Sequence, residues 1–368
     1  MTAAIHDRVR YLEGFTALAE AHAFREDVNC QWRVAKRPVG HITPDDFMWT
    51  EEPIPEPGAG EVLLKTHVLG VAPVMRFYMQ GTGAAGERVL EPGDVIHGRG
   101  VGEVIASNRD DISIGEFWQG QMGWQSYKAT SLTPQEKFFP MPHRDLPLEL
   151  GAGVLGMTGL SAHAGWFACG DPKKGDQVLI SGAAGGVGSI VVQLARIAGA
   201  KRVVGIAGGP KKCAFLKELG CDDVIDYRDE DVPQAIARLF PDGIDLYFDN
   251  VGGETLTAAL DHLAMRARIV LCGSISEYTL DNPFGPTNYT NLRKVDGRIN
   301  GFFVYNHLDR FEAVMDEMAG WIREGRLKPI QDVEEGMAFM PRALANLYFS
   351  ANVGVQCCRV RQRTKADL

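Results

Sequence analysis

Four glycines fall within seven residues, between a short apolar segment and a run with helical spacing. Gly182, Gly185 and Gly188 form a Gly-x-x-Gly-x-x-Gly pattern that follows the strand-like segment 177–181 and precedes the helix-like segment 187–199. Glycine allows a tight turn and lets backbone amides approach an anion, which the N-terminus of a helix attracts. Alone, the pattern fits either a ligand-free strand–helix turn or a turn that binds the diphosphate of a dinucleotide.

Strand-like and helix-like segments alternate regularly around this turn. The strand-like segments are 177–181, 202–207, 224–227, 244–250, 268–274 and 299–304, and the helix-like segments are 187–199, 210–219, 231–239, 254–265 and 308–324. This alternation predicts right-handed crossovers and an α/β, doubly wound parallel sheet of the Rossmann type. The glycine turn lies at the first crossover of that sheet, which favours dinucleotide binding over a ligand-free turn. Short strand candidates before and after this region predict a separate β-rich, barrel-like domain.

The end of the second strand favours a cofactor that carries an extra phosphate. In NAD-binding folds an acidic residue near this point binds the ribose 2′-hydroxyl. Here the strand ends in Gly208-Gly-Pro-Lys-Lys212, with two lysines and no acid. A 2′-phosphate is attracted by lysine and repelled by a carboxylate. The sequence therefore predicts NADPH, although Lys211 and Lys212 are also compatible with an ordinary solvated surface.

Composition restricts the partners and the compartment. A net charge of -9 argues against nucleic acid or an anionic membrane as the main partner. The N-terminus lacks the basic and apolar regions of a signal peptide, and no apolar run approaches the roughly 20 residues of a membrane span. The seven scattered cysteines fit reduced thiols. We expect a cytoplasmic protein.

Several motifs occur in a family-specific order. They are Pro53-Ile-Pro-Glu-Pro-Gly-Ala-Gly-Glu-Val62, Gly156-Met-Thr-Gly-Leu-Ser-Ala162, Ser181-Gly-Ala-Ala-Gly-Gly-Val-Gly188, Lys212-Cys-Ala-Phe-Leu-Lys-Glu-Leu-Gly220, Asp249-Asn-Val-Gly-Gly-Glu254, Cys272-Gly-Ser-Ile-Ser-Glu-Tyr278 and Asn300-Gly-Phe-Phe-Val304. From Gln31 onward the chain resembles the zinc-free medium-chain dehydrogenases/reductases, in the branch of leukotriene B4 dehydrogenase, prostaglandin reductase, and curcumin and 2-alkenal reductases. The resemblance implies a Rossmann NADPH-binding domain at 154–326, inserted in a GroES-like substrate domain at 31–153 and 327–368. Residues 1–30 form an N-terminal extension outside the family pattern.

The resemblance also implies a cofactor site. Lys212 and Tyr227 would hold the 2′-phosphate, Asn250 would line the cleft, and Gly273 and Phe303 with their neighbours would lie by the nicotinamide. Tyr278 matches a tyrosine beside the nicotinamide ribose and is the predicted catalytic residue; a packed tyrosine at a strand–loop junction is the alternative. The predicted cofactor-binding residues are Thr158, Ala184, Gly185, Gly186, Val187, Gly208, Lys212, Tyr227, Asn250, Cys272, Gly273, Ser274, Tyr278, Phe302, Phe303, Val304 and Asn352.

Three positions depart from the family pattern. Gly209 stands where relatives often have serine, Ala72-Pro-Val-Met-Arg76 lacks an acid and an aromatic on the substrate side, and Val355 stands where relatives often have lysine. These changes leave the cofactor prediction intact and the substrate open. Since Cys-x-x-Cys pairs are missing and His97-Gly98-Arg99 replaces the Gly-His-Glu of zinc enzymes, no metal is predicted.

The predicted function is NADPH-dependent reduction of the carbon–carbon double bond of α,β-unsaturated ketones or aldehydes. The hydride would go to the β-carbon, and solvent would supply the proton because no histidine or carboxylate acid stands out. Quinone reduction and a non-catalytic NADPH-binding role remain alternatives. The expected partners are a small enone or enal and a second copy of the chain, which in related enzymes pairs near 299–304.

Overall fold

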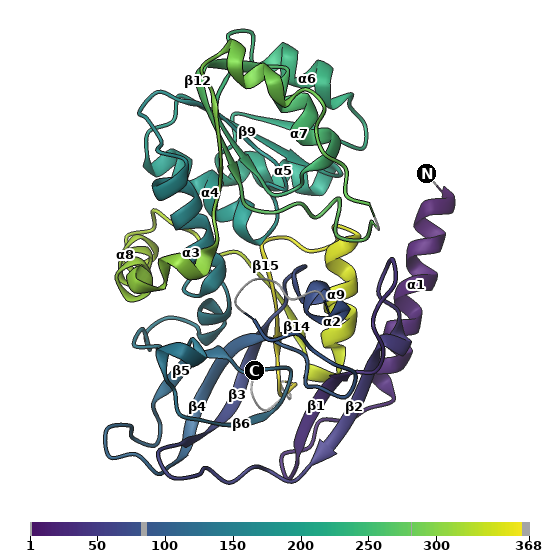
Figure 1. The fold of residues 1–368 in the computed structure, drawn as a ribbon, viewed down its shortest axis with the longest axis vertical. Coiled ribbons are helices and arrows are strands. Elements are labelled where there is room, and N and C mark those ends of the chain that lie inside the picture. The colour runs from purple at the N-terminus through teal and green to yellow at the C-terminus, as the bar shows by residue number, and fades with distance from the viewer. Residues whose placement is uncertain (1, 82–86, 281, 363–368) are drawn as a thin grey trace. The chain divides into compact units, whose positions relative to one another are not determined.

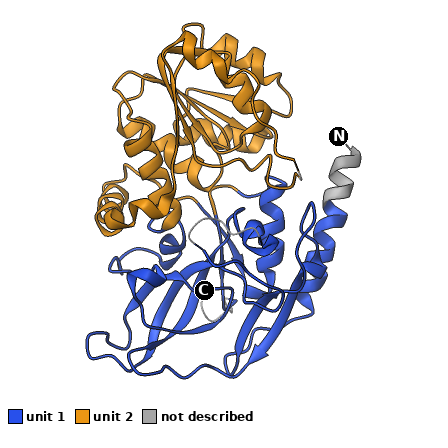
Figure 2. Cartoon of the chain, viewed as in Figure 1, with its two compact units in different colours: residues 1–156, 331–352, 356–368 blue, residues 157–330, 353–355 orange. Residues whose placement is uncertain are grey.

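A computed structural model describes residues 2–81, 87–280 and 282–362, and Figure 1 labels its elements. The chain forms two compact units, coloured in Figure 2. Unit 1 comprises residues 1–156, 331–352 and 356–368, and unit 2 comprises residues 157–330 and 353–355. Three residues close to the C-terminus therefore belong to unit 2, although the residues on both sides of them belong to unit 1.

Unit 2 is built on a parallel sheet with the strand order β10-β9-β8-β11-β12-β13. Its strands are β8 (Gln177–Ile180), β9 (Arg202–Ala207), β10 (Asp223–Asp226), β11 (Ile244–Asp249), β12 (Leu263–Leu271) and β13 (Arg298–Gly301). Its helices are α3 (Met157–His163), α4 (Gly186–Ile197), α5 (Pro210–Leu219), α6 (Val232–Leu239), α7 (Gly253–Leu260) and α8 (Phe311–Arg323). Counted from β8, the spatial order is 3-2-1-4-5-6, the order of dinucleotide-binding sheets. The predicted doubly wound Rossmann sheet is confirmed.

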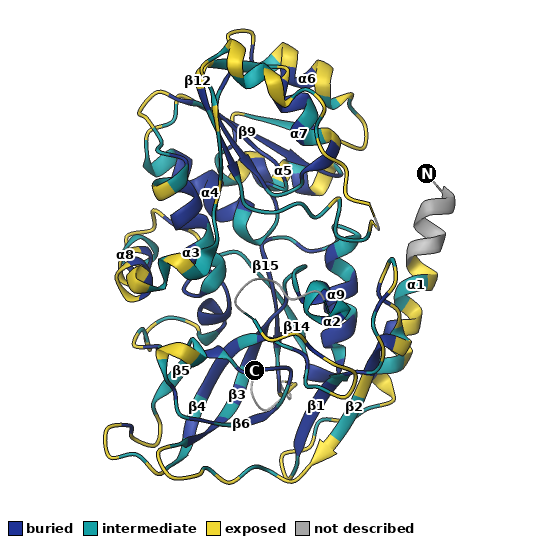
Figure 3. Ribbon diagram, in the orientation of Figure 1, coloured by how far each residue is buried: buried dark blue, intermediate teal, exposed yellow. Residues whose placement is uncertain are grey.

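The strands β8, β9 and β11 in the middle of the sheet of unit 2 are buried on both faces, as their dark colour in Figure 3 shows. Val178, Leu179 and Ile180 of β8 are all fully buried. Apolar residues in succession are typical of parallel strands that are covered by helices on both sides. The helix α4 is buried over the eight consecutive residues 188–195, so it is covered on every side and not only where it meets the sheet.

One predicted helix of unit 2 was too long. The spacing of apolar residues predicted a helix over 254–265, but α7 ends at Leu260 and β12 begins at Leu263. Leu263 pairs with Ile244 in β11 rather than extending the helical stripe. Arg266 then adopts a left-handed φ of 62°, and the register against β11 shifts near this point. Apolar spacing over so few residues fits both a helix end and a buried strand.

Unit 1 is β-rich and antiparallel. Its larger sheet has the order β14-β15-β3-β4-β5-β7 with β6 paired to β3, and β1 and β2 form a separate two-stranded sheet. The strands are β1 (Asn29–Val34), β2 (Phe47–Glu52), β3 (Val62–Gly70), β4 (Arg99–Ser107), β5 (Phe117–Gln121), β6 (Tyr127–Thr130), β7 (Phe139–Pro140), β14 (Gln331–Glu335) and β15 (Val355–Arg359). The expected β-rich part of the chain is therefore present as a separate sheet structure.

Three helices accompany the sheets of unit 1. They are α1 (Thr2–Glu20), α2 (Met75–Gln80) and α9 (Met340–Tyr348). Phe15 of α1 is fully buried against Phe47, so the N-terminal extension contributes to the core of this unit. The region after the predicted helix 308–324 was expected to contain only strands, and α9 shows that this prediction was wrong. Met340, Ala343, Leu344 and Leu347 have helical spacing and are all buried.

Shorter helical turns connect these elements. They are η1 (Pro44–Asp46), η2 (Pro134–Glu136), η3 (Leu148–Ala152), η4 (Ala164–Cys169), η5 (Tyr289–Lys294), η6 (Val304–Arg310) and η7 (Met337–Phe339). The part of the predicted helix 308–324 before residue 311 is such a turn, η6. None of the helices in the described part of the chain has the length and apolar character needed to cross a bilayer.

Candidate active site

The glycine turn after β8 folds tightly upon itself. Gly182 has a left-handed φ of 56°, and the Gly185 amide donates to the Gly182 carbonyl at 3.0 Å. A Cβ on Gly188 would lie 2.3 Å from the Gly182 carbonyl oxygen, so only glycine fits where α4 leaves the turn. Around Gly185 the only atom near a built Cβ is that same oxygen, at 3.2 Å. Backbone atoms of the same loop make most of these contacts.

Two neighbouring segments complete the surroundings of this turn. Thr158 in α3 lies next to Gly186, where a built Cβ would be 3.4 Å from the Thr158 methyl carbon and 3.5 Å from the Cα of Val355. The Gly354 amide donates to the Ala184 carbonyl at 2.8 Å. Residues 353–355 therefore lie against the turn within unit 2. Val187, half-buried in the first turn of α4, belongs to the same group.

Asn352 is placed differently from the other predicted site residues. It is a buried member of unit 1, whereas the remaining predicted residues all belong to unit 2. Its predicted contact with the cofactor stays a prediction.

A buried carboxylate organises the loop that follows β11. Asp249 is fully buried, and its Oδ1 accepts hydrogen bonds from the Ser181 and Tyr247 hydroxyls, both at 2.7 Å, and from the Gly252 amide at 3.0 Å. Asn250 in turn donates from Nδ2 to the Ser181 carbonyl at 2.8 Å. The predicted residue Asn250 is thus fixed beside the glycine turn by two residues that the sequence analysis did not select.

At the second glycine turn, after β9, the glycines contact side chains rather than backbone atoms. A Cβ on Gly208 would lie 2.6 Å from the Tyr227 ring, so the ring packs directly over this glycine. Gly209 has a φ of 92° and is the N-cap of α5. Lys212, the third residue of α5, is buried. Lys211 is exposed. Tyr227 therefore packs on Gly208, and the Lys212 amide donates to the Gly209 carbonyl at 3.1 Å. That Lys212 and Tyr227 hold a 2′-phosphate stays a prediction.

Arg228 is a cation at this turn that the sequence analysis missed. A Cβ on Gly209 would lie 3.4 Å from an Arg228 Nη1 atom, and the guanidinium lies 5.8 Å from the centre of the Tyr227 ring. Asp226, on the neighbouring strand, uses its Oδ1 to accept the Gly209 and Arg228 amides at 2.9 and 3.1 Å. Arg228 directly follows Tyr227, the tyrosine of the family pattern, and this position in the sequence could have indicated it.

The loop after β12 contains the predicted catalytic tyrosine. The Ser274 amide donates to the Tyr278 hydroxyl at 3.3 Å, and a Cβ on Gly273 would lie 3.2 Å from that oxygen. Burial raises the pKa of Tyr278, so the phenol keeps its proton at neutral pH and remains a hydrogen-bond donor. Burial also raises the pKa of Cys272 to about 12, which excludes a thiolate there at neutral pH.

The segment that follows β13 is predominantly aromatic. Phe302 and Phe248 both border Gly165, where a built Cβ would be 2.9 Å from each ring. Phe303 packs against Tyr305 with the ring centroids 4.9 Å apart, and Val304 begins η6. These contacts place Phe302 at the carboxyl-terminal side of the sheet, beside β11. The predicted contacts of residues 302–304 with a nicotinamide remain predictions.

These features fit an NADP-type dinucleotide. The first turn leaves space at Gly185 ahead of a helix N-terminus, as a diphosphate requires. The second turn has no acid on β9 and presents Lys212, Tyr227 and Arg228, as a 2′-phosphate requires. Ligands of such sheets bind at the carboxyl ends of the strands, where both turns lie.

Two family profiles match the chain, one described as "Zinc-binding dehydrogenase" over residues 186–320 and one described as "N-terminal domain of oxidoreductase" over residues 30–138. The "Putative NADP-dependent oxidoreductase YfmJ" of Bacillus subtilis (strain 168) is 38% identical over 90% of this chain and 97% of its own length. The chain belongs to the medium-chain dehydrogenase/reductase family.

Other members of the medium-chain dehydrogenase/reductase family are also similar. The "2-alkenal reductase (NADP(+)-dependent)" of Nicotiana tabacum is 35% identical, over 83% of this chain and 89% of its own. The crystal structure of CurA in complex with NADPH from Vibrio vulnificus matches with a TM-score of 0.83 and 32% identity, over 91% of this chain and 100% of that one. The predicted family and fold are thus confirmed.

One of the two matching families is described as zinc-binding, which raises the question of metal ligands in this chain. No cluster of three or more His, Cys, Asp and Glu side chains suited to a metal ion is found in the described part of this medium-chain reductase. His97 donates to the Arg88 carbonyl at 2.9 Å instead, and Gly98 and Arg99 follow it. That the enzyme works without a metal stays a prediction.

Proposed function

We propose that this chain is an NADPH-dependent reductase of the carbon–carbon double bond in α,β-unsaturated ketones or aldehydes. The observation that carries the proposal is the second glycine turn, in a chain similar to a 2-alkenal reductase over most of its length. There β9 ends without an acid, Tyr227 and Arg228 lie against Gly208 and Gly209, and Lys212 follows in the first turn of α5. A turn of this kind discriminates in favour of a 2′-phosphate, and the reactions of the relatives supply the chemistry.

The roles of the chain's own residues follow from their positions. When bound, NADPH supplies the hydride that goes to the β-carbon of the substrate. Tyr278 donates a hydrogen bond to the carbonyl oxygen, on which negative charge develops as the double bond is reduced. The Ser274 amide orients the phenol by donating to its oxygen. Solvent supplies the proton to the α-carbon, because we assign no histidine or carboxylate to that step.

The reaction is tested with NADPH that carries deuterium on the transferred face. Deuterium at the β-carbon of a saturated ketone or aldehyde is the expected result. Deuterium at a carbinol carbon would mean carbonyl reduction and would overturn the proposal. Consumption of NADPH only with quinones, giving hydroquinones, would favour quinone reduction. Tight NADPH binding without turnover of any enone, enal or quinone would favour a non-catalytic role.

The chain is further proposed to act as a cytoplasmic homodimer. β13 ends the strand order of the sheet and has only β12 as a neighbour among the described strands. Pairing with the β13 of a second copy would be isologous and would cover this edge. A built Cβ on Gly301 meets no atom within 4 Å, so Gly301→Lys places a charge at the edge without disturbing the monomer. Light scattering should give a dimer mass for the wild type and a monomer mass for this variant; a monomeric wild type would contradict the proposal.

A further inference from the structure

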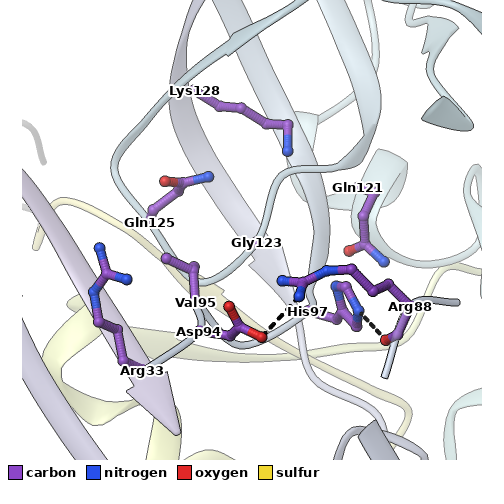
Figure 4. Close-up of a pocket in the computed structure, with 9 residues that line it drawn as sticks. All are labelled: Arg33, Arg88, Asp94, Val95, His97, Gln121, Gly123, Gln125 and Lys128. Atoms are coloured by element: carbon purple, nitrogen blue, oxygen red, sulfur yellow. Dashed lines mark hydrogen bonds and ion pairs between the residues drawn. The ribbon is translucent and has the colours of Figure 1, made fainter. Parts of the chain in front are cut away.

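Unit 1 contains a cavity of about 360 Å³. All of its lining residues belong to unit 1, and none of them belongs to either glycine turn. Figure 4 shows its lining, which comes from β1, β5, β6, the segment between β5 and β6, and the segment before β4. The charged side chains in the lining are Arg33, Arg88, Asp94 and Lys128. A cavity of this volume accommodates a small molecule.

Most of the polar groups in the lining already have partners. Arg88 pairs with Asp94 at 2.9 Å, and Arg33 pairs with Glu52 at 2.5 Å. His97 Nε2 lies 2.9 Å from the Arg88 carbonyl, which can only accept, so this nitrogen carries the hydrogen. Burial lowers the pKa of His97, so the ring is neutral at pH 7. The two ion pairs and the neutral imidazole leave the rest of the lining without net charge.

Lys128 is the exception. Its ammonium lines the cavity and has no hydrogen bond or ion pair with any described residue. In Figure 4 its side chain enters from the side opposite Arg88 and Asp94. Burial lowers the pKa of Lys128, and Glu136 acts in the opposite direction. Lys128 is not one of the residues whose buried nitrogen or oxygen lacks a partner, so water solvates its ammonium when no ligand is bound, and an anion can replace that water.

The side-chain amide of Gln121 is a second polar group in the lining. Gln121 accepts the Gly98 amide with its Oε1 at 2.8 Å, and this bond leaves its Nε2 group directed elsewhere. Gln121 also lines the cavity, and no described residue accepts from that Nε2. One unpaired ammonium and one amide NH₂ group provide N–H donors, while the only acid of the lining is engaged by Arg88.

We propose that this cavity is a binding site for a small oxyanion, a carboxylate or a phosphate group, held by Lys128 and Gln121. A cation is disfavoured because the cavity already has one positive charge in excess. The single excess charge fits a group with one negative charge better than a polyanion. The inference rests on unit 1 alone and does not depend on the proposed reductase activity.

Calorimetric titration of the whole protein with inorganic phosphate and, separately, with acetate tests this site. NADP+ is kept saturating so that the nucleotide site cannot bind the probes, and ionic strength is constant. At least one probe should bind saturably at one site. Lys128→Met should weaken that binding about tenfold or more, and Lys128→Arg should restore most of it. Lys65→Met is the matched control, because Lys65 lies on the neighbouring strand β3 and its partner Glu26 is more than half exposed.

Each outcome has a defined meaning. Binding of phosphate alone assigns a phosphate ester as the ligand, and binding of acetate assigns a carboxylate. If neither probe saturates the wild-type protein below about 10 mM, the proposal is overturned, and no variant needs to be measured. Equal affinity in the wild type and Lys128→Met would also overturn it. A melting temperature of Lys128→Met at or above that of the wild type verifies folding, since the variant removes an unpaired charge. If NADP+ fails to bind, the proposed function fails, while the comparison of Lys128 and Lys65 variants still tests the cavity.

Discussion

The two glycine turns of unit 2 use the same residue type in different ways. At the turn after β8, the glycines make room for backbone: Gly188 lies against the Gly182 carbonyl, and Ala184 accepts the Gly354 amide. At the turn after β9, Gly208 makes room for the Tyr227 ring, and charged side chains lie nearby. The first turn suits the diphosphate, which every dinucleotide has. The second turn suits the 2′-phosphate, which NADPH has and NADH lacks.

The difference separates affinity from selectivity. Backbone amides cannot be altered one at a time by mutation, so the first turn is sensitive mainly to added volume. Side chains can be removed individually, so the second turn is where selectivity for the 2′-phosphate can be changed without loss of the fold. The following variants test this division.

Gly188→Val should have the largest effect. Its Cβ would lie 2.3 Å from the Gly182 oxygen and 2.7 Å from the Cα of Ala183, so the backbone must move. We expect a loss of about 2–3 kcal/mol of stability and an about hundredfold or greater weakening of both NADPH and NADH binding. Thermal melts and fluorescence titrations measure the two effects. Gly186→Ala is the control for stability, since its Cβ would make only ordinary contacts at 3.4–3.5 Å. Loss of NADPH binding alone would break the comparison.

Lys212→Ala should change selectivity rather than overall nucleotide affinity. Removing a charged hydrogen bond to the 2′-phosphate should weaken NADPH binding about tenfold to hundredfold, and NADH binding less than about threefold. The exposed neighbour Lys211→Ala should leave both nearly unchanged. Equal losses for both cofactors would exclude the 2′-phosphate role of Lys212.

Tyr278→Phe alters neither turn and should separate turnover from binding. The loss of one donor to the carbonyl oxygen should lower kcat about tenfold and leave the dissociation constant of NADPH nearly unchanged. Because burial raises the pKa of Tyr278, wild-type kcat should not fall between neutral pH and about pH 9. The exposed Tyr289→Phe serves as the control. Unchanged kcat in Tyr278→Phe would indicate a packed tyrosine instead.

Arg228→Ala should give the smallest and most salt-dependent change. Its guanidinium is exposed, so its attraction for the 2′-phosphate is screened by ions. NADPH binding should weaken about threefold at low ionic strength and approach the wild-type value near 1 M salt. Arg238→Ala, an exposed arginine paired with Glu230, is the control. A salt-independent loss would mean that Arg228 acts through the structure of the turn.

The sequence was sufficient to predict most of unit 2. Its central strands are buried on both faces and are rich in consecutive apolar residues, as in Val178-Leu-Ile180, which short-range patterns detect. The glycine spacing correctly predicted the position of the first turn. The absence of an acid after Ala207 correctly predicted NADPH, because this signal lies within one short stretch of the sequence.

Features that depend on distant residues could not be predicted in this way. Asp249 accepts a hydrogen bond from Ser181, which is 68 residues away, and nothing in the local sequence links the two. Lys128 looks like an ordinary strand lysine until folding places it beside Gln121 and His97. The helix α9 was missed because its flanks resemble strand ends, although its apolar spacing is helical.

The segment 353–355 has a consequence for the order of folding. Gly354 donates to Ala184 across 170 residues of chain, and Val355 donates to the Ile330 carbonyl at 2.9 Å. During synthesis the β8 strand and its glycine turn leave the ribosome long before this segment exists. Unit 2 can therefore assemble its sheet early. The hydrogen bond from Gly354 to Ala184 in the glycine turn, however, can form only when the polypeptide is nearly complete. The nucleotide-binding turn should reach its final structure among the last steps of folding.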